Sequence, residues 1–459
     1  MTNETQRSCL TIVLAAGEGT RMKSDLPKVL HKVAGLEMVN HVVASAMQAG
    51  DSEDDLCVVI TGNNRDLVEA SVGARFGDVM FFEQYERLGT ANAVMAAENS
   101  LLYGFDDVLV LFGDTPLLQP QTLLDMRQCL TKSADVAVLG FRTSQPDGYG
   151  RLLEENGKLI AIREHKEASA KEREINFCNG GIMAINGKKC LELVSSISNK
   201  NQKGEFYLTD VVEIAHANGL QVVAHEGDSS EILGINTRVE LAQAEGLWQA
   251  RQRREMMLAG VTMQAPDTVF LSHDTRIGAQ TILEPNQFFA TGVTIGKSNT
   301  IRANCHFDTC VIQDHCDIGP YARLRPGTKL ANRAKVGNFV EIKKADIGEG
   351  AKVNHLSYIG DAIVGPKANI GAGTITCNYD GVNKHVTQIG AGAFIGSNSA
   401  LVAPVKIGDN AYVGSGSVIT KDAPDDSLVV SRARQVTIED KAKTLKLRAL
   451  RFKAQREKE

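Results

Sequence analysis

The sequence lacks both a long apolar run and any pair of cysteines spaced as CxxC. No stretch reaches about 18 consecutive apolar residues, the rough minimum for a membrane-spanning helix, and the polar start MTNETQRSC is not typical of a signal peptide. The nine cysteines are scattered along the chain, which favours free thiols in a reducing compartment over a disulfide framework. We therefore expect a cytoplasmic protein that does not insert into a membrane.

A strong charge of either sign is also missing. The formal net charge of -5 over 459 residues offers no basic footprint for nucleic acid and favours small-molecule substrates. Hydrophobic residues make up 43% and charged residues 23% of the chain, which is ordinary for a folded protein. A chain of this length exceeds what one hydrophobic core usually supports, so more than one domain is expected.

The first part of the chain alternates short apolar runs with segments of helical period. The runs that predict buried strands are LTIVLAA, DLCVVITG, VLVLFGD, ADVAVLGF and CNGGIMAIN. Continuous Val, Ile and Leu runs separated by helices favour a mostly parallel, Rossmann-like α/β sheet. This pattern predicts a first domain over residues 1–236, with its site at the carboxyl ends of the strands.

A change of pattern marks the end of this domain. Thr237 followed by Glu240 is a capping-box signature that opens a helix, and Gly260 can end it. The sequence therefore predicts a linker helix over residues 237–260.

Beyond Gly260, aliphatic residues recur every six positions. The ladder includes Ile277, Leu283, Phe289, Ile295, Ile301 and Phe307, and after single-residue slips it continues to Ile419. A six-residue repeat with one inward aliphatic residue per face is typical of a parallel β-helix, predicted here over residues 261–430. The insertion around Cys377–Gln388 should protrude as a loop, and residues 431–459 form a basic tail that ends in a helical pattern.

Chemistry-bearing residues follow two of the predicted strands. The glycine-rich turn in LAAGEGTRM can hold phosphate oxygens on its backbone amides, and Arg21 and Lys28 add positive charge for a triphosphate. Asp114 lies at the end of the apolar strand LVLFGD, where a carboxylate can bind Mg²⁺ near phosphates. Together they indicate magnesium-assisted nucleotidyl transfer.

Five segments of the first domain resemble sugar-nucleotide pyrophosphorylases: LAAGEGTRMKSDLPKVL, QYERLGTANAV, FGDTPLL, GYGRLLEENGKLIAIREHKEA and GEFYLTDVV. In the repeat region, RLRPG, VGNFVEIKKADIG, NHLSYIGDA and NIGAGTITCNYDG extend the resemblance. Over essentially the whole chain, the sequence resembles the bifunctional bacterial N-acetylglucosamine-1-phosphate uridyltransferase/glucosamine-1-phosphate N-acetyltransferase family. The resemblance implies a left-handed β-helix and synthesis of UDP-N-acetylglucosamine, a precursor of peptidoglycan and lipopolysaccharide.

For the first domain, the resemblance implies magnesium ligands at Asp114 and Asn236 and a set of residues around the nucleotide and the sugar. The residues expected to bind UTP or the UDP-sugar are Leu14, Ala15, Ala16, Gly17, Arg21, Lys28, Gln84, Gly89, Thr90, Gly150, Glu164, Asn179 and Asn236. Several of them also have plain structural alternatives, because Gly150 suits a turn, Glu164 suits a solvated surface, and Asn236 directly precedes the capping box.

For the β-helix, the resemblance makes His355 the general base that accepts a proton from the glucosamine amine. Its spacing between the inward Val353 and Ile359 alone predicts only an outward position near a corner. The residues expected around glucosamine 1-phosphate are Arg325, Lys343, Tyr358 and Asn369, and those expected around acetyl-CoA are Ala372, Asn378, Tyr379, Ser397, Ser415 and Arg432. Ser415 departs from the alanine familiar in the family, which a backbone contact would tolerate.

The resemblance also implies a homotrimer with acetyltransferase sites between neighbouring chains. This agrees with the flat, uncovered faces of a β-helix, which favour self-association.

The sequence leaves two other functions for the β-helix open. A monofunctional pyrophosphorylase with a regulatory β-helix would have no base at His355. A β-helix zinc enzyme of the γ-carbonic anhydrase type would need histidines at matching coil positions, and His306, His315 and His355 lack that spacing. Cys305, Cys310 and Cys316 are interpreted as small apolar fillers of the core rather than metal ligands.

Overall fold

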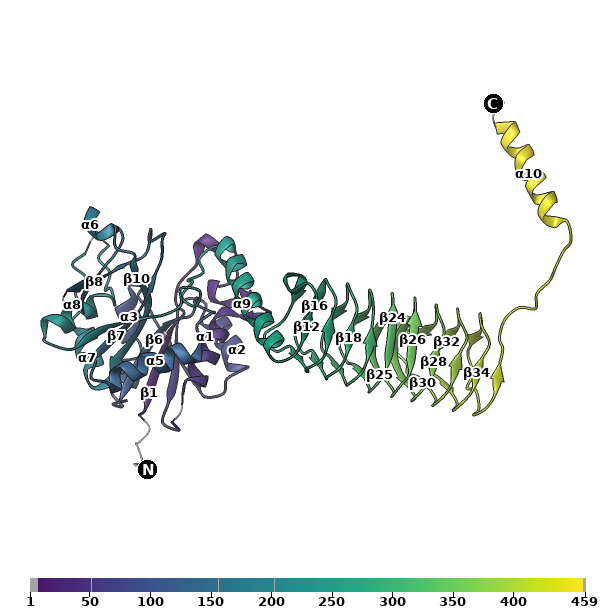
Figure 1. The fold of residues 1–459 in the computed structure, drawn as a ribbon, viewed down its shortest axis with the longest axis horizontal. Coiled ribbons are helices and arrows are strands. Elements are labelled where there is room, and N and C mark those ends of the chain that lie inside the picture. Colours follow the sequence, from purple (N-terminus) through teal and green to yellow (C-terminus); the bar gives the residue numbers. More distant parts are fainter. Residues whose placement is uncertain (1–6, 51, 156, 202, 457–459) are drawn as a thin grey trace. The chain divides into compact units, whose positions relative to one another are not determined.

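The computed structural model describes residues 7–50, 52–155, 157–201 and 203–456. The chain divides into two compact units, the first comprising Met1–Glu255 with Leu271–His273, and the second comprising Met256–Phe270 with Asp274–Glu459 (Figure 1). Among the described residues, no helix is both long and apolar enough to cross a membrane.

The first unit is built on a twisted sheet with the strand order β11-β7-β10-β6-β1-β4-β5. These strands are β1 (Cys9–Leu14), β4 (Leu56–Thr61), β5 (Val79–Glu83), β6 (Asp107–Phe112), β7 (Val136–Arg142), β10 (Phe177–Asn186) and β11 (Val222–Glu226). All five strands predicted from apolar runs are confirmed. Neighbours along this path are parallel except β10, which runs antiparallel to both β6 and β7.

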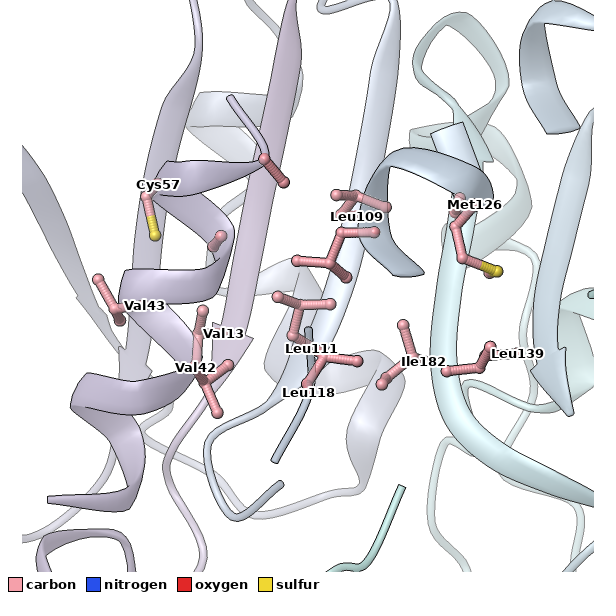
Figure 2. Packing of buried hydrophobic residues seen from close by; sticks show 14 of the residues in the cluster. Val13, Val42, Val43, Cys57, Leu109, Leu111, Leu118, Met126, Leu139 and Ile182 are labelled. Carbon is pink, nitrogen blue, oxygen red and sulfur yellow. The ribbon is translucent and has the colours of Figure 1, made fainter. Parts of the chain in front are cut away.

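Helices cover both faces of this sheet because successive strand residues point to opposite sides. The helices are α1 (Met38–Gln48), α2 (Arg65–Gly73), α3 (Thr90–Met95), α4 (Glu98–Leu101), α5 (Pro120–Thr131), α6 (Ala170–Arg173), α7 (Gly187–Ser195) and α8 (Asp210–Ala217). Val13 of β1 belongs to a core cluster with residues of α1 and α5, and Figure 2 shows it beside Val42 of α1. Ile12 belongs to a second cluster with residues of α3, α7 and α8. Burial on both faces explains the unbroken apolar runs.

Shorter elements complete the first unit. They are the 3-10 turns η1 (Thr20–Met22) and η2 (Lys28–Leu30), the hairpin of β2 (Lys32–Val33) with β3 (Leu36–Glu37), and the antiparallel pair of β8 (Arg151–Glu155) with β9 (Lys158–Arg163). β8 joins the main sheet through pairing of Arg151 with Cys178.

The capping box predicted at Thr237 is formed at the start of α9 (Arg238–Leu258). The Thr237 amide donates to Glu240 Oε2 at 2.7 Å, and the Glu240 amide donates to Thr237 Oγ1 at 3.3 Å. Gly260 follows with a φ of 97°, a left-handed conformation that ends the helix. The boundary between the compact units falls within α9, after Glu255.

The second unit is a parallel β-helix whose inward positions are the hexad aliphatics. Leu283, Ile301, Ile318, Val336 and Val353 stack through consecutive coils of one face and are each at most 1% exposed. Coils repeat every 17 or 18 residues in the pairings Ile295 with Ile312 and Leu283 with Ile301. The predicted repeat is confirmed, single-residue slips included.

One face of the β-helix is a ten-stranded sheet, and the remaining strands form a fifteen-stranded sheet in which β25 and β27 turn a corner. The first contains β12 (Thr262–Met263), β15 (Ile282–Leu283), β18 (Thr300–Ile301), β21 (Asp317–Ile318), β24 (Lys335–Asn338), β26 (Lys352–His355), β28 (Asn369–Ile370), β31 (Phe394–Ile395), β34 (Tyr412–Val413) and β36 (Leu428–Val429). The second contains β13 (Val269–Phe270), β14 (Arg276–Ile277), β16 (Gln287–Phe289), β17 (Thr294–Ile295), β19 (His306–Phe307), β20 (Cys310–Ile312), β22 (Arg323–Leu324), β23 (Thr328–Leu330), β25 (Glu341–Ile347), β27 (Tyr358–Val364), β29 (Ile375–Cys377), β30 (Thr387–Ile389), β32 (Ala400–Val402), β33 (Val405–Ile407) and β35 (Val418–Ile419).

The three clustered cysteines of this unit lie in its core. Cys305, Cys310 and Cys316 are each at most 2% exposed, and burial raises the pKa of their thiols to about 11, 12 and 11. Their interpretation as apolar fillers is confirmed. The predicted loop separates β29 from β30, and α10 (Lys441–Arg456) forms the fully exposed helix of the basic tail (Figure 1).

A buried histidine makes the stability of the first unit depend on pH. His41 Nε2 donates to the Val33 carbonyl at 2.8 Å, and the His41 ring lies 6.5 Å from that of Trp248 between centroids. Burial lowers the pKa of His41 from 6.5 to about 4. The folded protein therefore keeps His41 neutral in mild acid, while the unfolded chain takes up a proton below its pKa of 6.5.

We predict that the contribution of His41 to the free energy of unfolding is constant above the unfolded pKa of 6.5 and falls as the pH drops from there towards 4. At pH 5 this loss should be about 2 kcal/mol. Urea titrations followed through Trp248, the single tryptophan, report on this unit. His41→Gln keeps a donor for Val33 and removes the titration, so its pH dependence should be shallower by that amount. An unchanged pH dependence in this variant would contradict the prediction.

Candidate functional sites

The first unit holds a cavity of about 790 Å³ at the carboxyl ends of its parallel strands. β1 and β6 are paired so that Leu14 lies beside Phe112, which brings the glycine-rich turn after β1 next to Asp114 after β6. Twelve of the residues expected from sequence line the cavity: Leu14, Ala15, Ala16, Gly17, Arg21, Lys28, Gln84, Gly89, Thr90, Asp114, Glu164 and Asn179. The other two, Gly150 and Asn236, contact lining residues directly.

The glycine-rich turn leaves room for a ligand on one side and for Lys28 on the other. Gly17 is exposed, and a Cβ added there would meet nothing within 4 Å. Gly19 has a φ of 63°, and a Cβ at that position would lie 2.3 Å from Lys28 Cβ. The missing side chain at Gly19 therefore lets the Lys28 stem pass close to the turn and reach the cavity.

Lys28 joins the two residues expected to bind magnesium. Its ammonium forms an ion pair with the Asp114 carboxylate and donates to Asn236 Oδ1 at 3.0 Å. The backbones of this trio are also linked, because the Ile235 amide donates to the Asp114 carbonyl at 3.0 Å. Asn236 is thus part of the site as well as the neighbour of the capping box.

The segment after β5 forms the opposite wall. Gln84 Nε2 donates to the Gly89 carbonyl at 3.1 Å and to Asn92 Oδ1 at 2.8 Å. Gly89 has a φ of 115°, and a Cβ there would lie 2.5 Å from the Phe206 carbonyl oxygen. Thr90 Oγ1 accepts from the Leu208 amide at 2.9 Å. These contacts hold the wall against the GEFYLTDVV segment.

A β-bulge positions the remaining predicted residues. The register between β7 and β10 shifts between Asn179 and Met183, and the Asn179 amide donates to the Gly150 carbonyl at 2.8 Å. Glu164 is close by, since a Cβ added at Gly150 would lie 3.7 Å from Glu164 Oε1. Burial, with a smaller contribution from the charge of Glu167, raises the pKa of Glu164. A half-buried carboxylate here suits hydrogen bonding to a neutral polyol.

Other lining residues were not singled out from sequence. Arg87 forms an ion pair with Glu18 of the glycine-rich turn. Lys203 lies 5.8 Å from the centre of the Tyr207 ring, and both line the cavity. The motifs QYERLG and GEFYLTDVV contained Arg87 and Tyr207, but nothing in their spacing distinguished these side chains.

The second candidate site follows one corner of the β-helix. His355 is exposed, as its spacing predicted, and it lies two residues after the inward Val353. The same position in following coils is held by Ala372, Ser397 and Ser415, because Val353, Ile370, Ile395 and Val413 are paired in sequence. Four residues expected at the acetyl-transfer site therefore form one line along the corner.

The preceding coil supplies a partner for His355 that the sequence analysis missed. Asn338 lies beside His355 in the register of β24 and β26, and its Oδ1 is hydrogen bonded to His355 Nδ1. An amide oxygen can only accept, so the proton of a neutral imidazole lies on Nδ1 and Nε2 carries the free lone pair. His355 thus presents a base to solvent.

The line of corner residues ends at the start of the tail. Backbone hydrogen bonds run from Gly373 to His355, from Asn398 to Ala372 and from Gly416 to Ser397, at 3.0, 2.7 and 2.8 Å. Arg432 then donates from Nη1 to the Ser415 carbonyl at 2.6 Å. The contact uses the Ser415 backbone, so the residue type at this position does not affect it.

Cations gather on the neighbouring face. Arg325 Nη1 donates to Glu341 Oε1 at 2.7 Å, and Glu341 lies beside Tyr358 across β25 and β27. The Lys384 ammonium next to Lys343 is the main cause that lowers the pKa of Lys343, and the charge of Arg325 adds to this. Cations crowded in this way can form charge-assisted hydrogen bonds to a phosphate.

The protruding loop packs on this face through Asn378. Asn378 Nδ2 donates to Asp361 Oδ2 at 2.5 Å, and the Tyr358 ring folds over Gly360, where a Cβ would meet the Tyr358 hydroxyl at 2.4 Å. Tyr379 is 60% exposed on this loop, and its hydroxyl donates to the Gly381 carbonyl.

Asp380 braces this loop by accepting from the Asn383 amide at 2.6 Å and pairing with His385 at 2.7 Å. Asn369 lies on β28, one coil after β26, which carries His355. Its Oδ1 accepts a hydrogen bond from Asn354 Nδ2 at 3.2 Å.

Comparisons with known proteins match both units. Residues 11–205 match the family described as MobA-like NTP transferase domain, and residues 387–421 match the bacterial transferase hexapeptide (six repeats). Proteins described as "Bifunctional protein GlmU" resemble nearly the whole chain. That of Bartonella quintana (strain Toulouse) is 54% identical over 442 residues, which are 96% of this chain and 98% of the relative.

Two further relatives carry the same description. The protein of Chelativorans sp. (strain BNC1) is 56% identical over 98% of this chain and 99% of its own length. That of Agrobacterium fabrum (strain C58 / ATCC 33970) is 52% identical over 98% of each chain. The chain therefore belongs to the family of bifunctional GlmU proteins.

Proposed function

We propose that the two candidate sites catalyse the two steps of UDP-N-acetylglucosamine synthesis, acetyl transfer at the β-helix and uridylyl transfer in the cavity. The enzyme acetylates glucosamine 1-phosphate from acetyl-CoA and then joins the product to the uridylyl group of UTP, releasing pyrophosphate. Family membership over nearly the whole chain carries this conclusion. The product supplies cell wall synthesis, and free cysteines throughout the chain favour a cytoplasmic setting.

In the cavity, Lys28, Arg21 and the exposed amides around Gly17 bind and orient the triphosphate. The oxygen of the sugar phosphate attacks the α-phosphorus in line, so positioning and charge neutralisation are sufficient and no protein nucleophile is needed. Gln84, Gly89 and Thr90 form the wall expected to hold the uridine. Gly150, Glu164 and Asn179 form the end expected to hold the sugar, where Glu164 accepts hydrogen bonds from hydroxyl groups.

Magnesium fits the donor set of Asp114 and Asn236. A carboxylate and an amide oxygen are ligands that Mg²⁺ accepts, and both already share one cation, the Lys28 ammonium. When bound, the ion would neutralise charge on the phosphate oxygens. Asp114 and Asn236 would hold it, while Lys28 contacts the same phosphates.

At the β-helix corner, His355 acts as the general base. Its Nε2 lone pair accepts a proton from the amine of glucosamine 1-phosphate as that amine attacks the acetyl thioester, and the C–S bond then breaks to release coenzyme A as the thiol, which takes up the proton. Asn338 keeps the imidazole in the required tautomer. Arg325 and Lys343, with Lys384 beside them, bind the sugar phosphate, and Tyr358 and Asn369 orient the sugar.

The line of corner residues suits acetyl-CoA. From His355 to Ser415 there are three coil steps, or roughly 15 Å at the usual strand spacing. A long, thin pantetheine arm can lie along Ala372, Ser397 and Ser415 with its thioester at His355. Asn378 and Tyr379 cover the reacting end, and Arg432 can meet phosphates of the coenzyme.

We predict that His355→Ala abolishes acetyl transfer and leaves uridylyl transfer intact. Loss of a positioned general base should lower kcat at least about 10²-fold. Thiol release from acetyl-CoA measures the first reaction, and pyrophosphate release from UTP with N-acetylglucosamine 1-phosphate measures the second. Acetylation at the normal rate in this variant would refute the second active site and favour a regulatory β-helix.

The reciprocal change is Asp114→Ala. This variant should lose uridylyl transfer by about 10²-fold or more, because the negative charge that holds the cation is gone. Acetyl transfer, measured in the same preparation, serves as the control and should be unchanged. Parallel loss of both activities would point to misfolding instead of a local effect.

The family resemblance also supports a homotrimer. Tyr321 and Phe339 stack at a ring distance of 5.0 Å although 50% and 54% exposed, and Leu356 continues this apolar strip in the next coil. Such a strip favours contact with a neighbouring chain. Sedimentation should give about three times the 49.5 kDa of one chain, and Phe339→Glu should lower that mass. A wild-type mass of one chain would overturn the trimer.

A further inference from the structure

Lys28 occupies a position between two residues that the proposed function assigns to a metal. Its ammonium is paired with Asp114 and donates to Asn236 Oδ1 at 3.0 Å. The side chains of Lys28 and Asp114 are only 11% and 17% exposed, so little water screens this pair. One cation therefore already satisfies both oxygens.

The chain builds this contact from distant segments. Lys28 opens η2, its stem lies against Gly19, and Asn236 is 208 residues further along the sequence. The backbone bond from Ile235 to Asp114 keeps the two oxygen donors close to each other. The oxygens of Asp114 and Asn236 both contact the Lys28 nitrogen. They are therefore close enough together to bind one small cation between them.

We propose that the Lys28 ammonium is a placeholder cation, which competes with a divalent metal ion for Asp114 and Asn236 until the triphosphate draws it away. This inference rests on the proposed nucleotidyl transfer. Asp114 would then never be left without a counter-charge, which a part-buried carboxylate requires. Lys28 would move to phosphate oxygens as the metal takes its place, so that metal and nucleotide bind together.

Metal binding in the absence of nucleotide tests this competition. Mn²⁺ titrations of the full chain, followed by electron paramagnetic resonance, give the affinity without any reaction. Lys28→Met keeps an apolar stem and removes the ammonium, so Mn²⁺ should bind about tenfold tighter or more. Asp114→Ala in the same background should abolish the gain.

Arg21→Met is the matched control. Arg21 lines the same cavity, and this variant also removes one positive charge, but Lys28 keeps its contact with Asp114. A general field effect would tighten Mn²⁺ binding equally in both variants. Competition requires a clearly larger gain for Lys28→Met, and equal gains or no gain would overturn the proposal.

A second measurement uses the natural protein and does not depend on the folding of a variant. Acetic anhydride labelling, read by mass spectrometry, should modify Lys28 faster when Mn²⁺ is added, because the displaced amine leaves its carboxylate. Unchanged labelling would also overturn the proposal. If the protein shows the Mn²⁺ effects on affinity and labelling but makes no UDP-sugar, the proposed function is refuted and the placeholder role is not. If it makes UDP-sugar normally but shows neither Mn²⁺ effect, the placeholder role is refuted and the proposed function is not.

Discussion

In both compact units, parallel strands are held in register by buried aliphatic side chains, and each candidate site is assembled by that register. Leu14 lies beside Phe112 across β1 and β6, so the segments that follow these strands share one edge. In the β-helix, the pairing of Val336 with Val353 places Asn338 beside His355. A one-residue slip in either pairing would turn these side chains to another face and separate the site.

In both candidate sites, the cationic side chains are in contact with other charged groups. Lys28 is paired with Asp114, and Arg325 is paired with Glu341. Lys343 is instead crowded by Lys384, which lowers its pKa. In the proposed second site, a bound phosphate would accept hydrogen bonds from Arg325, which Glu341 already positions, and would relieve the repulsion between Lys343 and Lys384. Preorganised cations of this kind lose little side-chain freedom when the anion arrives.

Glycine matters at the few positions where two segments nearly touch. Gly19 admits the stem of Lys28, Gly89 admits the Phe206 backbone, and Gly360 admits the ring of Tyr358. The contact of Gly89 joins segments far apart in the sequence, whereas Lys28 lies nine residues from Gly19 and Tyr358 two residues from Gly360. The glycines therefore act on the sites indirectly, through the approach that they permit.

The sequence by itself determined the five strands predicted from apolar runs, the hexad ladder and the outward position of His355. These features follow from local periodicity, since an inward position must be apolar wherever the chain repeats. The tertiary structure alone decided that Asn236 meets Lys28, that Asn338 sets the tautomer of His355, that Lys384 faces Lys343, and that β10 runs antiparallel. Such contacts depend on side chains outside the inward ladder, on a bulge in β10, or on the path of a loop, and none of these leaves a periodic trace in the sequence.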